Sequence, residues 1–256
     1  KKGEENNKTH KREMDATKSN SSLRWGILSL ACVMMVGNYY CYDNPAALHE
    51  PLKRRFSDKM SENDFEYYFN LLYSVYSIPN IVLPFFGGFL IAKVGNRAML
   101  LVFAALIVVG QIIFTIGVSM TNIKIMLFGR VVFGLGGESI NVSQMVMMTD
   151  WFRGKEVALA MGLNLSIARF GSAINDVTSP RLSTAYGLDN ALWIGAFICI
   201  ISLICAAIVC FIDRAYEKRH PEIIDHAARD AAERISLSDA KEFPKVYWLL
   251  TASCFV

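Results

Sequence analysis

Charged residues are scarce through most of this 256-residue sequence. They make up 19% of it, against 53% hydrophobic residues, whereas average soluble domains carry more charge and less apolar character. The charges gather in the first 22 residues, in short gaps and after residue 212, which leaves long apolar runs between them. This pattern excludes a large soluble core and indicates a membrane protein.

The usual marks of an enzyme are also missing. The six cysteines form no CxxC pair, which argues against a zinc site or a redox dithiol. No nucleophile–base set, metal cluster or phosphate-binding loop stands out. We therefore expect no enzymatic activity, no cofactor, no metal and no nucleic-acid partner.

Six apolar runs are each about 20 residues or longer, enough for a helix to cross about 30 Å of hydrocarbon. They cover residues 23–42, 67–92, 98–120, 123–149, 157–177 and 191–212. Backbone groups in lipid must bond internally, so the runs are predicted to be helices. The sequence lacks an initiator Met and stops inside an apolar run, so we expect a piece of a longer protein.

These runs predict an all-α membrane protein that lies in the lipid bilayer. The expected parts are a disordered cytoplasmic tail (1–22), a six-helix transmembrane bundle (23–212), a cytoplasmic linker (213–245) and the start of a seventh transmembrane helix (246–256). Within the linker, apolar residues recur at helical spacing. A short amphipathic surface helix and a plain charged linker explain that spacing equally well.

The distribution of Lys and Arg predicts the orientation. With a cytoplasmic N-terminus, 18 of the 26 basic residues lie inside and 6 outside, while Arg130 and Arg169 lie within the membrane. Cytoplasmic loops carry an excess of basic residues. The basic run 53–55 falls on the wrong side, among acidic neighbours.

Two segments carry recognisable motifs. Gly87-Gly88-Phe89-Leu90-Ile91-Ala92-Lys93-Val94-Gly95-Asn96-Arg97 resembles the short cytoplasmic loop of the major facilitator superfamily, and the segment 127–137, with Arg130 and spaced glycines, resembles its fourth-helix motif. The resemblance implies conformational roles for Gly88, Gly95, Arg97 and Arg130. The family's acidic latch position is Ala92 here. A buried Arg is costly in lipid and usually functional, but Arg130 is equally well explained as a donor to backbone carbonyls between helices.

An acid and a base are predicted at the same depth on consecutive spans. Glu138 and Arg169 lie about 15 and 14 residues into their helices, near the bilayer midplane, with Arg130 about 12 Å further outward. Transporters of this kind bind substrate at the midplane. A carboxylate that holds an ammonium and a guanidinium that holds a carboxylate suit a zwitterion such as an amino acid or short peptide. A packing salt bridge between the two residues is the alternative.

Polar and aromatic neighbours favour a cavity. Asn141 lies one turn from Glu138, and Ser166 one turn from Arg169. Tyr42 and Tyr73 are candidate substrate-binding residues, although tyrosines near span ends also serve as interfacial anchors.

Four further segments narrow the resemblance to the lysosomal dipeptide transporter branch of the major facilitator superfamily. They are residues 37–48, 136–139, 151–156 and 168–172. In that branch the residues matching Glu138 and Arg169 line the peptide site, and we assign Asp43 of the first segment to the conformational group. The branch also pairs with a glycosylated lysosomal membrane protein, which fits the lack of sequons in the loops expected outside. The branch's dileucine sorting signal is absent from residues 1–22.

The leading hypothesis is a multi-pass lysosomal membrane transporter with a cytoplasmic N-terminus that exports dipeptides from lumen to cytosol by alternating access. Downhill uniport would suffice, although a buried Glu138 can also carry a proton. The alternatives are a carrier of another organic solute, such as a sugar or organic anion, and a transport-inactive sensor or scaffold, which Ala92 would suit. A seven-helix receptor is disfavoured because such receptors have an outside N-terminus.

Overall fold

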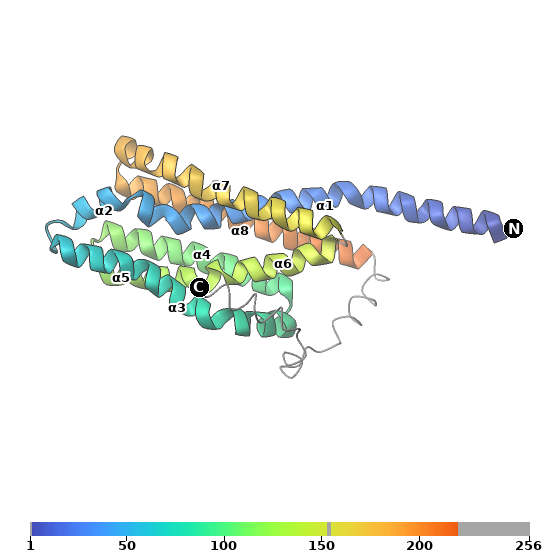
Figure 1. The fold of residues 1–256 in the computed structure, drawn as a ribbon, viewed down its shortest axis with the longest axis horizontal. Helices are drawn as coiled ribbons and strands as arrows, with labels where there is room; N and C mark the ends of the chain where they lie inside the picture. Colours follow the sequence, from blue (N-terminus) through green and yellow to red (C-terminus); the bar gives the residue numbers. More distant parts are fainter. Residues whose placement is uncertain (1, 153–154, 220–256) are drawn as a thin grey trace. The chain divides into compact units, whose positions relative to one another are not determined.

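The computed structural model describes residues 2–152 and 155–219, with the side chains of that range except 2–21, 81–82, 84–89, 92 and 155. All elements of this part are α-helices (Figure 1). They are α1 (Lys2–Ala47), α2 (His49–Phe56), α3 (Glu62–Val94), α4 (Asn96–Ser119), α5 (Ile123–Gly137), α6 (Ser139–Trp151), α7 (Lys155–Tyr186) and α8 (Leu188–Arg219). One compact unit ends at Cys210, inside α8, and the contacts below lie within it.

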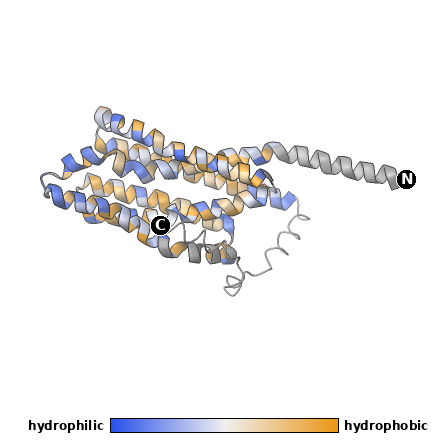
Figure 2. Cartoon of the chain, in the orientation of Figure 1, coloured by the Kyte–Doolittle hydropathy of each residue, from blue (hydrophilic) through white to orange (hydrophobic). Residues whose placement is uncertain are grey.

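The predicted all-α class is confirmed, and each of the six apolar runs is almost entirely helical, the fourth being interrupted at Glu138. Four helical segments of the described chain are long and apolar enough to cross a membrane: Asn96–Ser119, Ile123–Trp151, Glu156–Tyr186 and Leu188–Arg219. Figure 2 shows hydrophobic residues along these helices and hydrophilic residues concentrated near α2 and at helix ends. The expected seventh helix, 246–256, and most of the linker lie outside the described residues.

The first helix differs from the expectation. It begins at Lys2, so it includes the segment 1–22 that the sequence predicted to be a disordered tail. Residues 4–22 contain no Gly or Pro, and extending an existing helix costs far less free energy than nucleating a new one. The apolar part of α1 therefore supplies a nucleus from which the helix continues toward the N-terminus.

Glycines allow neighbouring helices to pack closely. A Cβ added at Gly110 of α4 would lie 2.4 Å from the backbone nitrogen of Phe133 in α5. One added at Gly171 of α7 would lie 2.3 Å from the carbonyl oxygen of Val36 in α1. The pairs α4–α5 and α1–α7, which lie side by side in Figure 1, are thus held backbone to backbone, as is common between helices in lipid.

Two helical hairpins have single-residue connections. Gly95 joins α3 to α4 with φ +99°, and Gly187 joins α7 to α8 with φ +88°. Positive φ values strain residues that have a Cβ, so glycine is the fitting residue at both turns. The Gly95 N–H donates to the Ile91 carbonyl at 2.9 Å.

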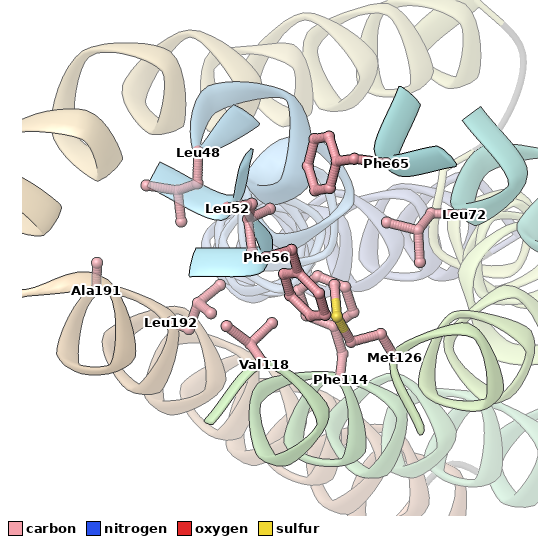
Figure 3. Close-up of a cluster of buried hydrophobic side chains, with 10 residues drawn as sticks. All are labelled: Leu48, Leu52, Phe56, Phe65, Leu72, Phe114, Val118, Met126, Ala191 and Leu192. Carbon is pink, nitrogen blue, oxygen red and sulfur yellow. The ribbon is translucent and has the colours of Figure 1, made fainter. Parts of the chain in front are cut away.

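The short helix α2 was not predicted. Its apolar residues Leu52 and Phe56, with Leu48 before it, recur every four residues and are fully buried. Figure 3 shows them packed among side chains of the longer helices. The whole cluster is Leu48, Leu52, Phe56, Phe65, Leu72, Phe114, Val118, Met126, Ala191 and Leu192.

Acidic partners neutralise two of the three basic residues in the run 53–55 of α2. Lys53 pairs with Glu62 at the start of α3, and Arg55 pairs with Asp189 at the start of α8. The hydrogen bond from Lys53 holds the pKa of Glu62 below its ordinary value and raises the pKa of Lys53. The basic run 53–55, which falls on the side expected to carry few basic residues, thus belongs to a helix that ion pairs attach to the end of the bundle.

Candidate functional site

Glu138 lies at a break in the fourth predicted span. The helix α5 ends at Gly137 and α6 begins at Ser139, and the Asn141 N–H donates to the Glu138 carbonyl at 3.1 Å instead of to residue 137. The Gly137 carbonyl accepts side-chain amides, from Asn38 at 3.2 Å and from Asn141 at 3.4 Å. Such broken helices are tolerated in membranes where other groups satisfy the backbone.

Two side chains hold the Glu138 carboxylate. The Tyr76 hydroxyl donates to Oε1 at 3.1 Å, and the Asn141 amide donates to Oε2 at 3.2 Å. Tyr76 is buried, whereas Glu138 is exposed within the described bundle. Hydrogen bonds to both oxygens fix the carboxylate in one orientation and leave it accessible to a cation.

Arg169 lies on α7 with its guanidinium over the ring of Tyr39, 4.6 Å from the ring centre. Its side chain is also exposed. Among the ion pairs of residues 22–152 and 156–219, none joins Glu138 to Arg169. The described contacts therefore do not support the packing salt bridge that the sequence left open.

Arg130 is fully buried inside an aromatic cluster. The rings of Tyr42, Tyr73, Tyr76, Phe114 and Phe133 all lie 5.3–5.8 Å from its guanidinium carbon. Its two terminal nitrogens donate to the Cys41 and Tyr42 carbonyls of α1, at 3.4 and 2.8 Å. These contacts support the structural interpretation of Arg130, a tie between α5 and α1.

Four of the six substrate-binding candidates fall into two adjacent groups. Asn141 holds Glu138, as its spacing suggested. Tyr42 and Tyr73 instead surround Arg130, and Tyr76 connects the groups because its ring lies 4.8 Å from that of Tyr42. Ser166 is exposed on α7 and donates to the Gly162 carbonyl at 2.8 Å.

The residues assigned to conformational change are dispersed. Gly95 makes the turn between α3 and α4. Arg97 follows in the first turn of α4, where its carbonyl accepts a hydrogen bond from Cys210 at 3.5 Å. Gly88 lies within α3, in a stretch whose side chains are not described. Asp43 is half-buried and near enough to Tyr39 and Tyr42 to interact electrostatically.

Sequence reasoning missed two tyrosines of the site. Tyr39 stacks on Arg169, and Tyr76 donates to Glu138. Each lies three positions from a tyrosine that the sequence did single out, Tyr42 or Tyr73, and Tyr40 stands directly after Tyr39. Only the rotation of each helix decides which of them faces the charged pair. Within the described residues, no three His, Cys, Asp or Glu side chains are grouped to hold a metal.

Comparison with known proteins supports the resemblance. The chain is 39% identical to the lysosomal dipeptide transporter MFSD1 of Homo sapiens over 239 residues, which is 89% of this chain and 49% of that protein. The protein of the same name from Danio rerio is 38% identical (89% and 50%), and that from Gallus gallus is 32% identical (89% and 47%). The chain spans about half the length of the curated relatives it matches.

A solved structure shares the fold. The MFS proton:xylose symporter XylE, bound to 6-bromo-6-deoxy-D-glucose, matches with a TM-score of 0.67 at 14% identity, over 84% of this chain and 53% of that one. At this identity the likeness concerns the fold alone. The sequence model of the Major Facilitator Superfamily matches residues 21–256. The chain therefore belongs to the Major Facilitator Superfamily.

Proposed function

We propose that the protein containing this chain exports dipeptides from the lysosomal lumen to the cytosol by alternating access. The observation that carries the proposal is the state of Glu138 and Arg169, hereafter the zwitterion clamp. Both side chains are exposed and neither forms an ion pair with the other, while partners fix the Glu138 carboxylate and place the Arg169 guanidinium over Tyr39. A carboxylate and a guanidinium held in this way suit the ammonium and carboxylate ends of a peptide.

The names of the relatives support the substrate class and the compartment. The matched proteins of Homo sapiens, Danio rerio and Gallus gallus are each called a lysosomal dipeptide transporter. Lysosomal hydrolysis supplies dipeptides, so downhill uniport suffices to move them outward. The same family resemblance supports a glycosylated lysosomal membrane protein as an accessory subunit, and the Lys and Arg bias supports a cytoplasmic N-terminus.

The clamp would be exposed to each side of the membrane in turn as two six-helix bundles rock around it. Arg130, Gly88, Gly95, Arg97 and Asp43 are proposed to support that movement. Binding must stay weak enough for release, so we expect affinities well short of nanomolar.

The test is thermal stabilisation of the purified full-length protein by dipeptides, since a ligand that binds the folded state raises the melting temperature by mass action. We expect free dipeptides to stabilise the parent. Dipeptides blocked by N-acetylation and C-amidation should not, because they lack both charges.

Glu138→Gln and Arg169→Ala should each weaken the apparent affinity for dipeptides at least about tenfold, because each removes roughly one charge-assisted contact. The thermal stabilisation by dipeptides should fall accordingly. If blocked and free dipeptides stabilise equally, the clamp does not bind the termini. If a sugar or an organic anion shifts the parent and no dipeptide does, the substrate proposal is wrong.

A further inference from the structure

Tyr39 on α1 connects the two ends of the zwitterion clamp. The Arg169 guanidinium lies 4.6 Å from its ring centre. Asn141, whose amide donates to Glu138 at 3.2 Å, lies near the Tyr39 hydroxyl. One half-buried side chain therefore contacts the base directly and lies near a residue that holds the acid.

Opposite charges near each other attract strongly where water is partly excluded. Even so, Glu138 and Arg169 do not pair in the described bundle. Each has its own partners instead: Tyr76 and Asn141 occupy both oxygens of Glu138, and the Tyr39 ring face attracts the guanidinium by a cation–π contact. A tyrosine ring is also rigid, with only two rotatable side-chain bonds, so it can hold the guanidinium at a fixed distance.

We infer that Tyr39 is a spacer that keeps Arg169 away from Glu138 and so sets the length of the zwitterion that the clamp accepts. This inference rests on the proposed function. The charged ends of a dipeptide are one residue further apart than those of an amino acid, and a residue spans at most about 3.3–3.6 Å. Loss of the spacer lets the guanidinium move toward the carboxylate, which favours the shorter ligand.

Four variants of the full-length protein test the spacer. Tyr39→Phe keeps the ring and removes the hydroxyl. Tyr39→Leu removes the ring face, and Tyr39→Met does the same with a longer side chain should the leucine variant fail to fold. Tyr67→Leu is the matched control, because Tyr67 on α3 is 65% exposed and its ring contacts Tyr68 rather than the clamp.

The first readout is thermal stabilisation by L-alanyl-L-alanine and by L-alanine. We expect Tyr67→Leu to keep the parent's preference for the dipeptide, and Tyr39→Phe to lose clearly less of that preference than Tyr39→Leu because it keeps the ring face. Tyr39→Leu should weaken dipeptide binding about tenfold. The ratio of the affinity for L-alanyl-L-alanine to that for L-alanine should fall by a similar factor. A parent-like ratio in Tyr39→Leu, or a loss in Tyr39→Phe as large as in Tyr39→Leu, overturns the inference.

The second readout needs no peptide. Glu138→Gln and Arg169→Gln are combined in a double-mutant cycle of melting temperatures, once in the parent and once with Tyr39→Leu. We expect near-additive effects in the parent and clear coupling in the leucine background, where the acid and base pair. If the Tyr39→Leu background shows coupling but the parent binds no dipeptide, the proposed function is wrong and the spacer role of Tyr39 is supported. If the parent binds dipeptides but the Tyr39→Leu background shows no coupling, the spacer role is wrong and the proposed function is supported.

Discussion

At the scale of single residues, Arg130 shows how a buried cation is kept without an acid. No acidic side chain pairs with it among the described residues, and its terminal nitrogens donate to the Cys41 and Tyr42 carbonyls. Cys41 stands four positions before Pro45, which has no N–H to offer its carbonyl. Arg130 therefore supplies a donor that the proline withholds, while five aromatic rings surround its charge.

This arrangement predicts the effect of two substitutions. Arg130→Lys should lower the free energy of unfolding by about 2 kcal/mol, because an ammonium replaces a planar fork that bonds two carbonyls at once. Pro45→Ala restores a helical N–H for the Cys41 carbonyl, so Arg130→Lys should lower the free energy of unfolding less in the Pro45→Ala background than in the parent. Thermal unfolding of the four proteins measures this coupling. Strict additivity would show that Arg130 does not substitute for the missing N–H.

Within the candidate site, the sequence singled out the charged residues more readily than the aromatic ones. Glu138 and Arg169 are rare charges inside apolar runs, so counting residues from each membrane surface was enough to propose them as a pair. Tyr39 is one of three tyrosines in four positions, from Tyr39 to Tyr42. These point in different directions around α1, and that rotation depends on packing against α7, which no local pattern in the sequence reveals.

At the scale of helices, the apolar runs predicted the long elements well because the bilayer fixes their length and forces their backbones to bond internally. The interruption at Glu138 and the short helix α2 were missed for a physical reason. Both depend on contacts from other segments: Asn38 takes up the freed Gly137 carbonyl, and the bundle end buries Leu52 and Phe56.

Two glycines of α7 predict opposite outcomes for the same substitution. Gly171→Ala should reduce the free energy of unfolding by about 1–3 kcal/mol, because the new Cβ would meet the Val36 carbonyl oxygen of α1 at 2.3 Å and force the helices apart. Gly162→Ala should raise it by about 0.5–1 kcal/mol, since nothing lies within 4 Å and alanine favours helix. Melting temperatures compare the two variants. If Gly171→Ala raised the melting temperature as much as Gly162→Ala, the α1–α7 contact would not be closely packed.

At the scale of the whole molecule, the charge bias predicts that the N-terminus and the segment 57–61 lie on opposite sides of the membrane. The ion pairs of α2 strengthen that prediction. Because Glu62 and Asp189 neutralise Lys53 and Arg55, these two basic residues are weaker evidence against placing α2 on the outside. The remaining basic residues keep their inside excess.

A single substitution checks the orientation. Lys59→Asn places an N-x-S sequon at positions 59–61, on an exposed segment between α2 and α3. We expect the expressed protein to gain one glycosidase-sensitive sugar, seen as a mobility shift on a gel. The natural sequons at Asn7 and Asn20 serve as internal controls and should stay unmodified. A sugar at Asn7 or Asn20 with none at position 59 would mean that the N-terminus lies outside and that the proposed orientation is wrong.

The one-residue turns at Gly95 and Gly187 have a mechanical consequence. Helices joined through a single residue have no slack between their facing ends. A displacement of the end of α3 or α7 is therefore carried to the start of α4 or α8 instead of being absorbed in a loop. Insertion of a few flexible residues at either turn would remove that coupling.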